Sequence, residues 1–198
     1  MDLDLFRRLC ETPGVPGREE RVRALIEQSI DGLFDEVRTA TLTGFQRRFC
    51  LILKFGRGSF DKPSLMVALD QGGECHGLAF RIPAEIVKQE SETVWVRELI
   101  YGDYLPVFVN IDTPQGEVEA LTFAIDPEGE RYAPNLSDER TARMIAEGGG
   151  WIGSNLEYLD SLVDHLQTLG LSDPDIEDLH RRARAVAARS TTELGSQI

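Results

Sequence analysis

The stretch Val94–Pro106, read as Val-Trp-Val-Arg-Glu-Leu-Ile-Tyr-Gly-Asp-Tyr-Leu-Pro, most constrains how this chain can fold. An apolar, aromatic segment leads into a Gly-Asp turn, after which Tyr-Leu-Pro predicts the start of a strand. One acid, Glu98, lies inside the apolar part. Its apolar neighbours in sequence are Trp95, Leu99 and Ile100. Such neighbours would desolvate its carboxylate and raise its pKa, which suits a group that accepts and returns a proton near neutral pH. The alternative is that Glu98 only pairs with Arg97 or another surface cation, as most such acids do.

Strand patterns precede helical patterns along the rest of the chain. The expected strands are Gln46–Phe55, Ser64–Leu69, Cys75–Ile82, Leu105–Ile111 and Glu119–Asp126. Gln71-Gly72-Gly73, between the second and third of these, predicts a hairpin turn. The expected helices are Pro83–Ser91, a segment that follows the N-cap Ser137 and stops at Gly148, Asn155–Leu169, and Asp173–Arg189.

The first residues have a different pattern, with apolar residues at helical spacing in Asp2–Glu11 and in Arg18–Gly32. We therefore expect residues 1–34 to form an N-terminal helical extension. No linker or repeat divides residues 35–189, which we expect to form one domain, and residues 190–198 are expected to be a frayed tail.

Composition narrows the possible partners and compartment. A net charge of −13 argues against nucleic acid or an anionic membrane as a partner. The three cysteines, Cys10, Cys50 and Cys75, form no CxxC pair, so neither a disulfide framework nor a zinc site is expected. His76, His165 and His180 are far apart in sequence and form no HExxH-type motif, so we expect no metal site. The start lacks a signal-peptide pattern and no apolar run is long enough to span a membrane, so we expect a cytoplasmic protein.

Several separated motifs occur in the order found in one known family. They are GFQRRFC, RGSFDKPSLMVALDQGGECHGLAFRIP, VWVRELIYGDYLP, VEALTFAIDPEGERYA and GWIGSNLEYLDSLVDHLQTLGLSDPDIEDL. From about Asp35 to about Ala185 the chain resembles the ChaC-type gamma-glutamylcyclotransferases. The resemblance implies an α+β fold with a small mixed, mostly antiparallel, barrel-like sheet surrounded by helices.

The resemblance also implies a reaction, the cleavage of glutathione to 5-oxoproline and Cys-Gly. The substrate's own α-amine attacks its γ-carbonyl, so no metal or organic cofactor is required. In the family the Glu of the Arg-Glu pair is the catalytic acid and base, and the matching residue here is Glu98. Trp95 is the nearest candidate wall for a hydrophobic pocket around it.

One family motif does not occur in this sequence. Family members have a Tyr-Gly-Ser-Leu loop whose backbone holds the gamma-glutamyl group, and residues 1–40 here instead resemble the N-terminus of glutamyl-aminopeptidase-type metallopeptidases. That part contains none of the metallopeptidase metal ligands. Two hypotheses follow: an active cyclotransferase, or a catalytically inactive homologue that acts as a binding or structural protein.

Three further residues are candidates for substrate binding, each with a structural alternative. Tyr104 can donate a hydrogen bond to substrate or anchor a strand. Tyr158 matches a family motif near the pocket but also has the spacing of an aromatic at the edge of a core. Arg57, like Arg47, can bind a substrate carboxylate with two hydrogen bonds or serve as an ordinary surface arginine. His76, beside Cys75, is expected to be a packed or surface histidine.

Overall fold

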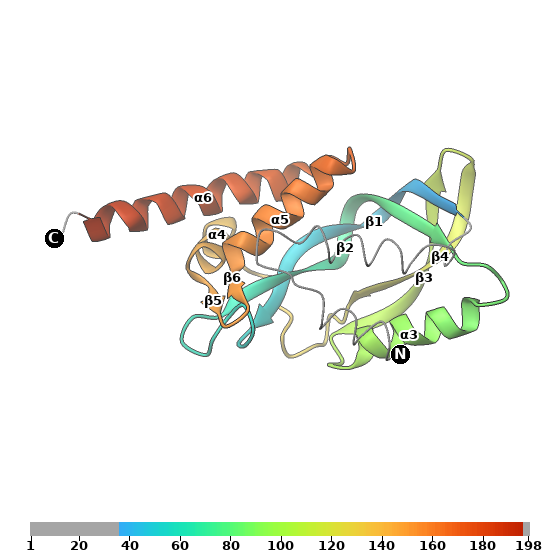
Figure 1. Ribbon diagram of the computed structural model, residues 1–198, viewed down its shortest axis with the longest axis horizontal. Coiled ribbons are helices and arrows are strands. Elements are labelled where there is room, and N and C mark those ends of the chain that lie inside the picture. The colour runs from blue at the N-terminus through green and yellow to red at the C-terminus, as the bar shows by residue number, and fades with distance from the viewer. Residues whose placement is uncertain (1–35, 196–198) are drawn as a thin grey trace, which may run out of the picture. The chain divides into compact units, whose positions relative to one another are not determined.

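A four-stranded sheet forms the centre of the protein. The computed structural model describes residues 36–195, with side chains to residue 189, so the expected extension at residues 1–34 lies outside the described residues. The sheet contains β1 (Glu36–Leu53), β2 (Ser64–Arg81), β3 (Tyr104–Thr113) and β4 (Gly116–Ile125) in the order β2-β1-β3-β4 (Figure 1). β3 pairs with both β1 and β4 in the antiparallel direction. The expected α+β class with a mostly antiparallel sheet is confirmed.

The sheet is open in the described part of the chain, whereas the family resemblance predicted a barrel-like one. Its edge strands are β2 and β4, which are not paired with each other. Closing a barrel requires the two edge strands to meet through a continuous ladder, and four strands in this order leave both edges unjoined.

β3 and β4 form a regular hairpin that sets the position of the turn before β3. Their register pairs Tyr104 with Ile125 at one end and Thr113 with Gly116 at the other. Gly116 has a φ of +118°, a conformation that glycine adopts without the steric cost of a side chain. The sequence predicted both strands; β3 extends beyond the predicted Leu105–Ile111 at both ends, and β4 begins before the predicted Glu119–Asp126 strand and ends at Ile125.

β2 is one continuous strand where the sequence predicted a hairpin turn at Gln71-Gly72-Gly73. Gly72 and Gly73 do have positive φ values, +107° and +61°, but they bend the strand without reversing it. The side chain of Gln46, on the neighbouring strand β1, lies over both glycines, at 3.1–3.2 Å from where a Cβ would be. The glycine pair thus makes room for a cross-strand side chain.

Helix α3 (Val87–Leu99) is longer than the predicted Pro83–Ser91 helix and begins later. The apolar stretch that contains Glu98 therefore continues a helix, and Glu98 lies in its last turn. Gly102, with φ +69°, makes the turn after the helix, and its N–H donates to the carbonyl of Leu99. The predicted Gly-Asp turn and the strand start at Tyr104 are both confirmed.

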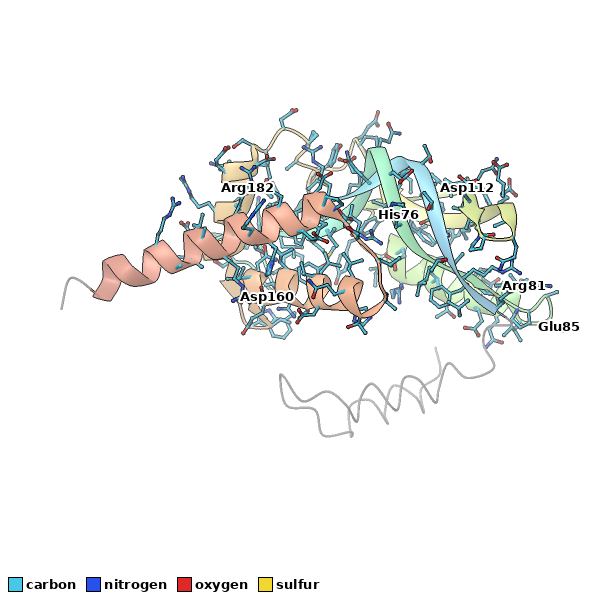
Figure 2. The ribbon with its side chains drawn as sticks, turned by 90° about the horizontal axis from the view of Figure 1, so that it is seen from above. His76, Arg81, Glu85, Asp112, Asp160 and Arg182 are labelled. Atoms are coloured by element: carbon cyan, nitrogen blue, oxygen red, sulfur yellow. The ribbon has the colours of Figure 1, made fainter. Side chains whose placement is uncertain are left out.

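Three helices pack together against β1 and β2 (Figure 1). They are α4 (Asp138–Glu147), α5 (Asn155–Thr168) and α6 (Pro174–Gly195), with the short strands β5 (Gly149–Gly150) and β6 (Gly153–Ser154) between the first two. The buried cluster between them contains Phe49, Leu65, Ala142, Ile145, Leu159, Val163, Leu166, Ile176 and Ala183. Asp160 on α5, labelled in Figure 2, joins α5 to α6 through His180 at 2.7 Å and Arg184 at 2.8 Å.

The ends of these helices follow the sequence closely. Ser137 caps α4 by accepting from the N–H of Arg140, as predicted. Ser154 caps α5, and the side chain of Glu157 bonds back to the N–H of Ser154 at 2.9 Å, which completes a capping box.

The described residues divide into two compact units. One contains residues 36–38 and Leu78–Arg97, and the other contains Thr39–Gly77 and residues 98–195. Each unit is described by itself, and every residue of the site described below belongs to the second.

Candidate active site

Glu98 is partly exposed, in the last turn of α3. The apolar neighbours that the sequence suggested for it face solvent to a large extent, since Ile100 is 67% exposed and Trp95 is 40% exposed. Trp95 lies in the other unit, and its role as a pocket wall stays a prediction. Within its own unit, Glu98 is linked to buried groups on other elements.

Tyr104, at the start of β3, connects Glu98 to those buried groups. The pKa of Tyr104 is raised to about 12, chiefly because the phenol is desolvated by burial and next because the negative charge of Glu98 is nearby. Tyr158 and Cys50 contribute in the same direction. The phenol therefore stays protonated at neutral pH and remains a hydrogen-bond donor close to a carboxylate.

Tyr158 projects from the second turn of α5 toward β1 and β2. Its ring meets the ring of Phe49 edge-on, with centroids 5.8 Å apart and an interplanar angle of 65°. Burial raises the pKa of Tyr158, and a hydrogen bond from the backbone of Val67 and the charge of Arg57 oppose that rise. Tyr158 is thus a core-edge aromatic, as its helical spacing suggested, whose hydroxyl lies in the same electrostatic environment as Tyr104.

Arg57 comes from the loop that joins β1 to β2, and its guanidinium lies over the Tyr158 ring at 5.6 Å. Its Nη1 donates to the carbonyl of Ser154, at the N-cap of α5, at 2.9 Å. A guanidinium has five N–H donors in a fixed fork, so this bond leaves others that can bind a planar anion. The structure therefore brings Arg57, Tyr158, Tyr104 and Glu98 together through successive contacts and charge interactions.

Tight packing of glycine backbone holds the Arg57 loop in place. The N–H of Ile152 donates to the carbonyl of Gly56 at 3.1 Å, which ties the loop to the β5–β6 turn. A Cβ on Gly150 would collide with the carbonyl oxygens of Gly56 and Gly58. The glycine at position 150 is therefore explained by the close approach of two backbones.

A further ion pair, which sequence reasoning missed, lies in the turn between Glu98 and Tyr104. Asp103 is 6% exposed and accepts from Nε of Arg131 at 2.8 Å and from its Nη2. Asp103 lies directly before β3 and Arg131 lies in the loop after β4. The only local signal is that Asp103 directly precedes a predicted strand, and that does not reveal its pairing with Arg131.

Other candidates prove to be structural. Arg47 makes an ion pair with Asp173 at 3.1 Å, both side chains being largely buried. His76, labelled in Figure 2, is half-exposed on β2, with Nδ1 3.0 Å from the hydroxyl of Thr41 and Nε2 3.0 Å from the carboxylate of Glu74. This agrees with the expectation of a packed or surface histidine.

The two described cysteines are both free thiols. Cys50 is fully buried in a small cluster with Leu51, Ala68 and Ile125. Burial is the largest of the causes that raise its pKa to about 12, so the thiol is not a nucleophile at neutral pH. Among residues 36–189, no group of three or more acidic, histidine or cysteine side chains is arranged to hold a metal ion. None of the described helices is long and apolar enough to cross a membrane.

Fold and site together define a class: an α+β protein with an acid at the end of a helix, beside buried tyrosines and an arginine, in a unit built on an antiparallel sheet. A family model described as ChaC-like protein matches residues 24–186, and the chain belongs to this family. The match covers the sheet, α4, α5 and most of α6, as well as all four site residues.

Relatives of known activity support the same assignment. The chain is 40% identical over 147 residues to the glutathione-specific gamma-glutamylcyclotransferase of Escherichia coli K12, covering 74% of this chain and 64% of that protein. It is 31% identical over 158 residues to the human glutathione-specific gamma-glutamylcyclotransferase 1, covering 77% of this chain and 70% of that protein. The chain thus spans about two thirds of the length of these relatives.

The fold resembles that of a crystal structure of a yeast gamma-glutamylcyclotransferase specific to glutathione. The TM-score is 0.66 at 18% identity, with 78% of this chain and 92% of that chain covered. At this identity the comparison establishes the fold, which is gamma-glutamylcyclotransferase-like as the motifs predicted.

Proposed function

We propose that this protein is a gamma-glutamylcyclotransferase that cleaves glutathione to 5-oxoproline and Cys-Gly, with Glu98 as general acid and base. The observation that carries the proposal is that the charge of Glu98 acts on the partly buried phenol of Tyr104, which stays protonated at neutral pH. The E. coli and human relatives named above act on glutathione, which supports this choice of substrate.

The reaction forms one C–N bond and breaks another. The α-amine of the gamma-glutamyl group attacks its own γ-carbonyl, which closes a five-membered lactam, and the amide bond to cysteine breaks. Holding the reacting atoms of one molecule together gives a large advantage, of order 10⁵ M or more in effective molarity for well-oriented cases. The protein has to hold the folded rotamer and manage the protons.

Glu98 can manage both proton transfers in sequence. As a carboxylate it accepts a proton from the substrate's amine, and as a carboxylic acid it returns one to the departing amine of Cys-Gly. No net proton is left on the enzyme after a full cycle. The neutral hydroxyl of Tyr104 is a donor that can stabilise either the Glu98 carboxylate or the oxyanion of the tetrahedral intermediate.

Arg57 is the proposed anchor for a carboxylate of the substrate. The guanidinium of Arg57 is restrained by its contact with the Tyr158 ring and by its hydrogen bond to the carbonyl of Ser154. Tyr158 then acts as a platform for Arg57 and as part of the pocket wall.

We also propose a cytoplasmic location, because glutathione keeps cytosolic thiols reduced and the described cysteines are free.

The test is release of 5-oxoproline from glutathione by the purified protein. Glu98→Gln keeps the shape of the side chain but removes the base, and we expect kcat to fall by about 10²–10⁴-fold. Glu92→Gln, an exposed acid on the same helix, is the matched control and should leave kcat unchanged.

A second control uses the substrate. N-acetylglutathione has no free α-amine and should not be cleaved, because the nucleophile is blocked. Absence of 5-oxoproline release by the unaltered protein at high concentration would support the inactive-homologue hypothesis instead. Release that survives Glu98→Gln would remove Glu98 from the mechanism.

A further inference from the structure

The ion pair between Asp103 and Arg131 lies where the chain passes from Glu98 to Tyr104. The carboxylate of Asp103 is bound by two nitrogens of one guanidinium, a two-point contact that fixes rotation as well as position. The carbonyl of Asp103 also accepts from the N–H of Asp126 at 2.8 Å. Asp103 is therefore held both by its side chain and by its backbone.

Arg131 is itself fixed to the centre of the sheet. Its carbonyl accepts from the N–H of Ile52 on β1 at 2.9 Å, and the next residue, Tyr132, forms a bridge with Leu51. The guanidinium lies over two aromatic rings that also contact each other, 5.8 Å from the ring of Phe55 and 5.5 Å from that of Tyr101. Such contacts restrict a long side chain that would otherwise sample many rotamers.

The chain between the two site residues is short. Tyr104 is fixed by its pairing with Ile125, so the direction in which the last turn of α3 presents Glu98 depends on the turn that contains Asp103. Tyr101, whose ring packs on Arg131, belongs to the same turn. Arg131 thus holds this turn at two residues, Asp103 and Tyr101.

We propose that Asp103 and Arg131 are positioning residues for the reaction, which tie the turn that follows Glu98 to β1 so that the carboxylate is presented to Tyr104 and the substrate. This inference rests on the proposed function and adds to it a pair that does not touch the substrate. A displacement of about 1 Å in a catalytic group can lower the rate by about 10²-fold. Loss of the pair should therefore lower kcat with little effect on KM.

The experiment compares Asp103→Asn, Arg131→Met and Arg131→Lys with a matched control. Arg47→Met breaks a similar pair, in which Arg47 on β1 binds Asp173, directly before α6, at 3.1 Å, with both side chains largely buried. For Asp103→Asn and Arg131→Met we expect kcat to fall by about 10–100-fold and KM to change by less than about threefold. Arg131→Lys keeps the charge but not the two-point contact, so its kcat should be intermediate. Arg47→Met should lose thermal stability and keep its kcat.

A measurement independent of activity distinguishes failure of the positioning role from failure of the proposed function. Hydrogen exchange of peptides covering residues 98–104 should be faster in Arg131→Met than in the unaltered protein, and unchanged in Arg47→Met. A folded Arg131→Met protein with unaltered exchange in that peptide, or with unaltered kcat, overturns the positioning role. If the unaltered protein cleaves no glutathione, the proposed function fails, and the exchange result alone decides whether the pair holds the turn.

Discussion

Asn155 offers the sharpest test of how the helices are attached to the sheet. It is fully buried at the start of α5, and its side chain spans the backbone of Leu65 on β2. Oδ1 accepts from the N–H of Leu65 at 3.0 Å and Nδ2 donates to its carbonyl at 2.7 Å. The amide thus pairs one buried donor and one buried acceptor that would otherwise lack partners.

The cost of removing this amide follows from the two groups that it satisfies. A buried N–H or C=O that loses its partner costs about 1–3 kcal/mol, so Asn155→Ala should lower the free energy of unfolding by about 3 kcal/mol or more. For a chain of this size that corresponds to a decrease in Tm of roughly 6–12 °C. Asn155→Leu fills the space but makes neither bond, and it should lose a comparable amount.

Urea denaturation followed by far-UV circular dichroism gives the free energy and the slope m. Asn135→Ala, at an exposed position, is the control and should change stability by less than about 0.5 kcal/mol. If Asn155→Ala lost less than about 1 kcal/mol with m unchanged, the two bonds would not have the role assigned to them. Because Tyr158 lies one turn further along α5, loss of the two hydrogen bonds between Asn155 and Leu65 should also lower kcat.

Three further results are expected. Arg57→Met should raise KM for glutathione by about 10-fold or more with kcat nearly unchanged, as measured by steady-state kinetics. The reason is that the substitution removes a charge-assisted contact with a substrate carboxylate from the ground state and the transition state alike. Burial is the main cause that raises the pKa of Cys50 from 9.0 to about 12, so the folded protein binds more protons than the unfolded chain between these values. The free energy of unfolding should therefore fall as pH rises above about 9. Urea denaturation midpoints measured between pH 7 and 11 should fall less in Cys50→Ala than in the unaltered protein. Gly58→Ala should be strongly destabilised in a thermal melt, because its Cβ would collide with the carbonyl of Leu53 and lie 2.8 Å from the N–H of Ser64.

Local sequence signals predicted the elements whose ends are determined by nearby residues. Ser137 and Ser154 mark helix starts because an N-cap bonds to a backbone N–H within three residues, and the β3–β4 turn lies within one short segment. Gly72 and Gly73 were misread as a reversal because the reason for them is Gln46 on another strand. Glycines at these positions indicate an unusual backbone conformation, but only the pairing with the neighbouring strand determines whether the chain reverses or merely bends.

The same distinction between local and distant determinants applies to the candidate site. Glu98, Tyr104, Tyr158 and Arg57 were proposed from motifs, whereas the apolar neighbours of Glu98 in sequence were a poor guide to its surroundings. Ile100 faces solvent, and the desolvated partner is Tyr104, beyond the turn. Sequence neighbours of a residue at a helix end point in several directions, so their hydrophobicity says little about its surroundings.

The Asp103–Arg131 pair could not have been predicted from one sequence, although both residues are charged and Asp103 directly precedes a strand. It exists because β3 and β4 form a hairpin of matched length, which returns the chain to the level of Tyr104 at Ile125 and leaves the loop after β4 beside the turn before β3. A shift of one residue in that register would turn the side chains of β4 to the opposite face and displace the loop that contains Arg131 relative to Asp103. The precision with which Glu98 is presented therefore depends on the register of a hairpin that contributes only Tyr104 to the site.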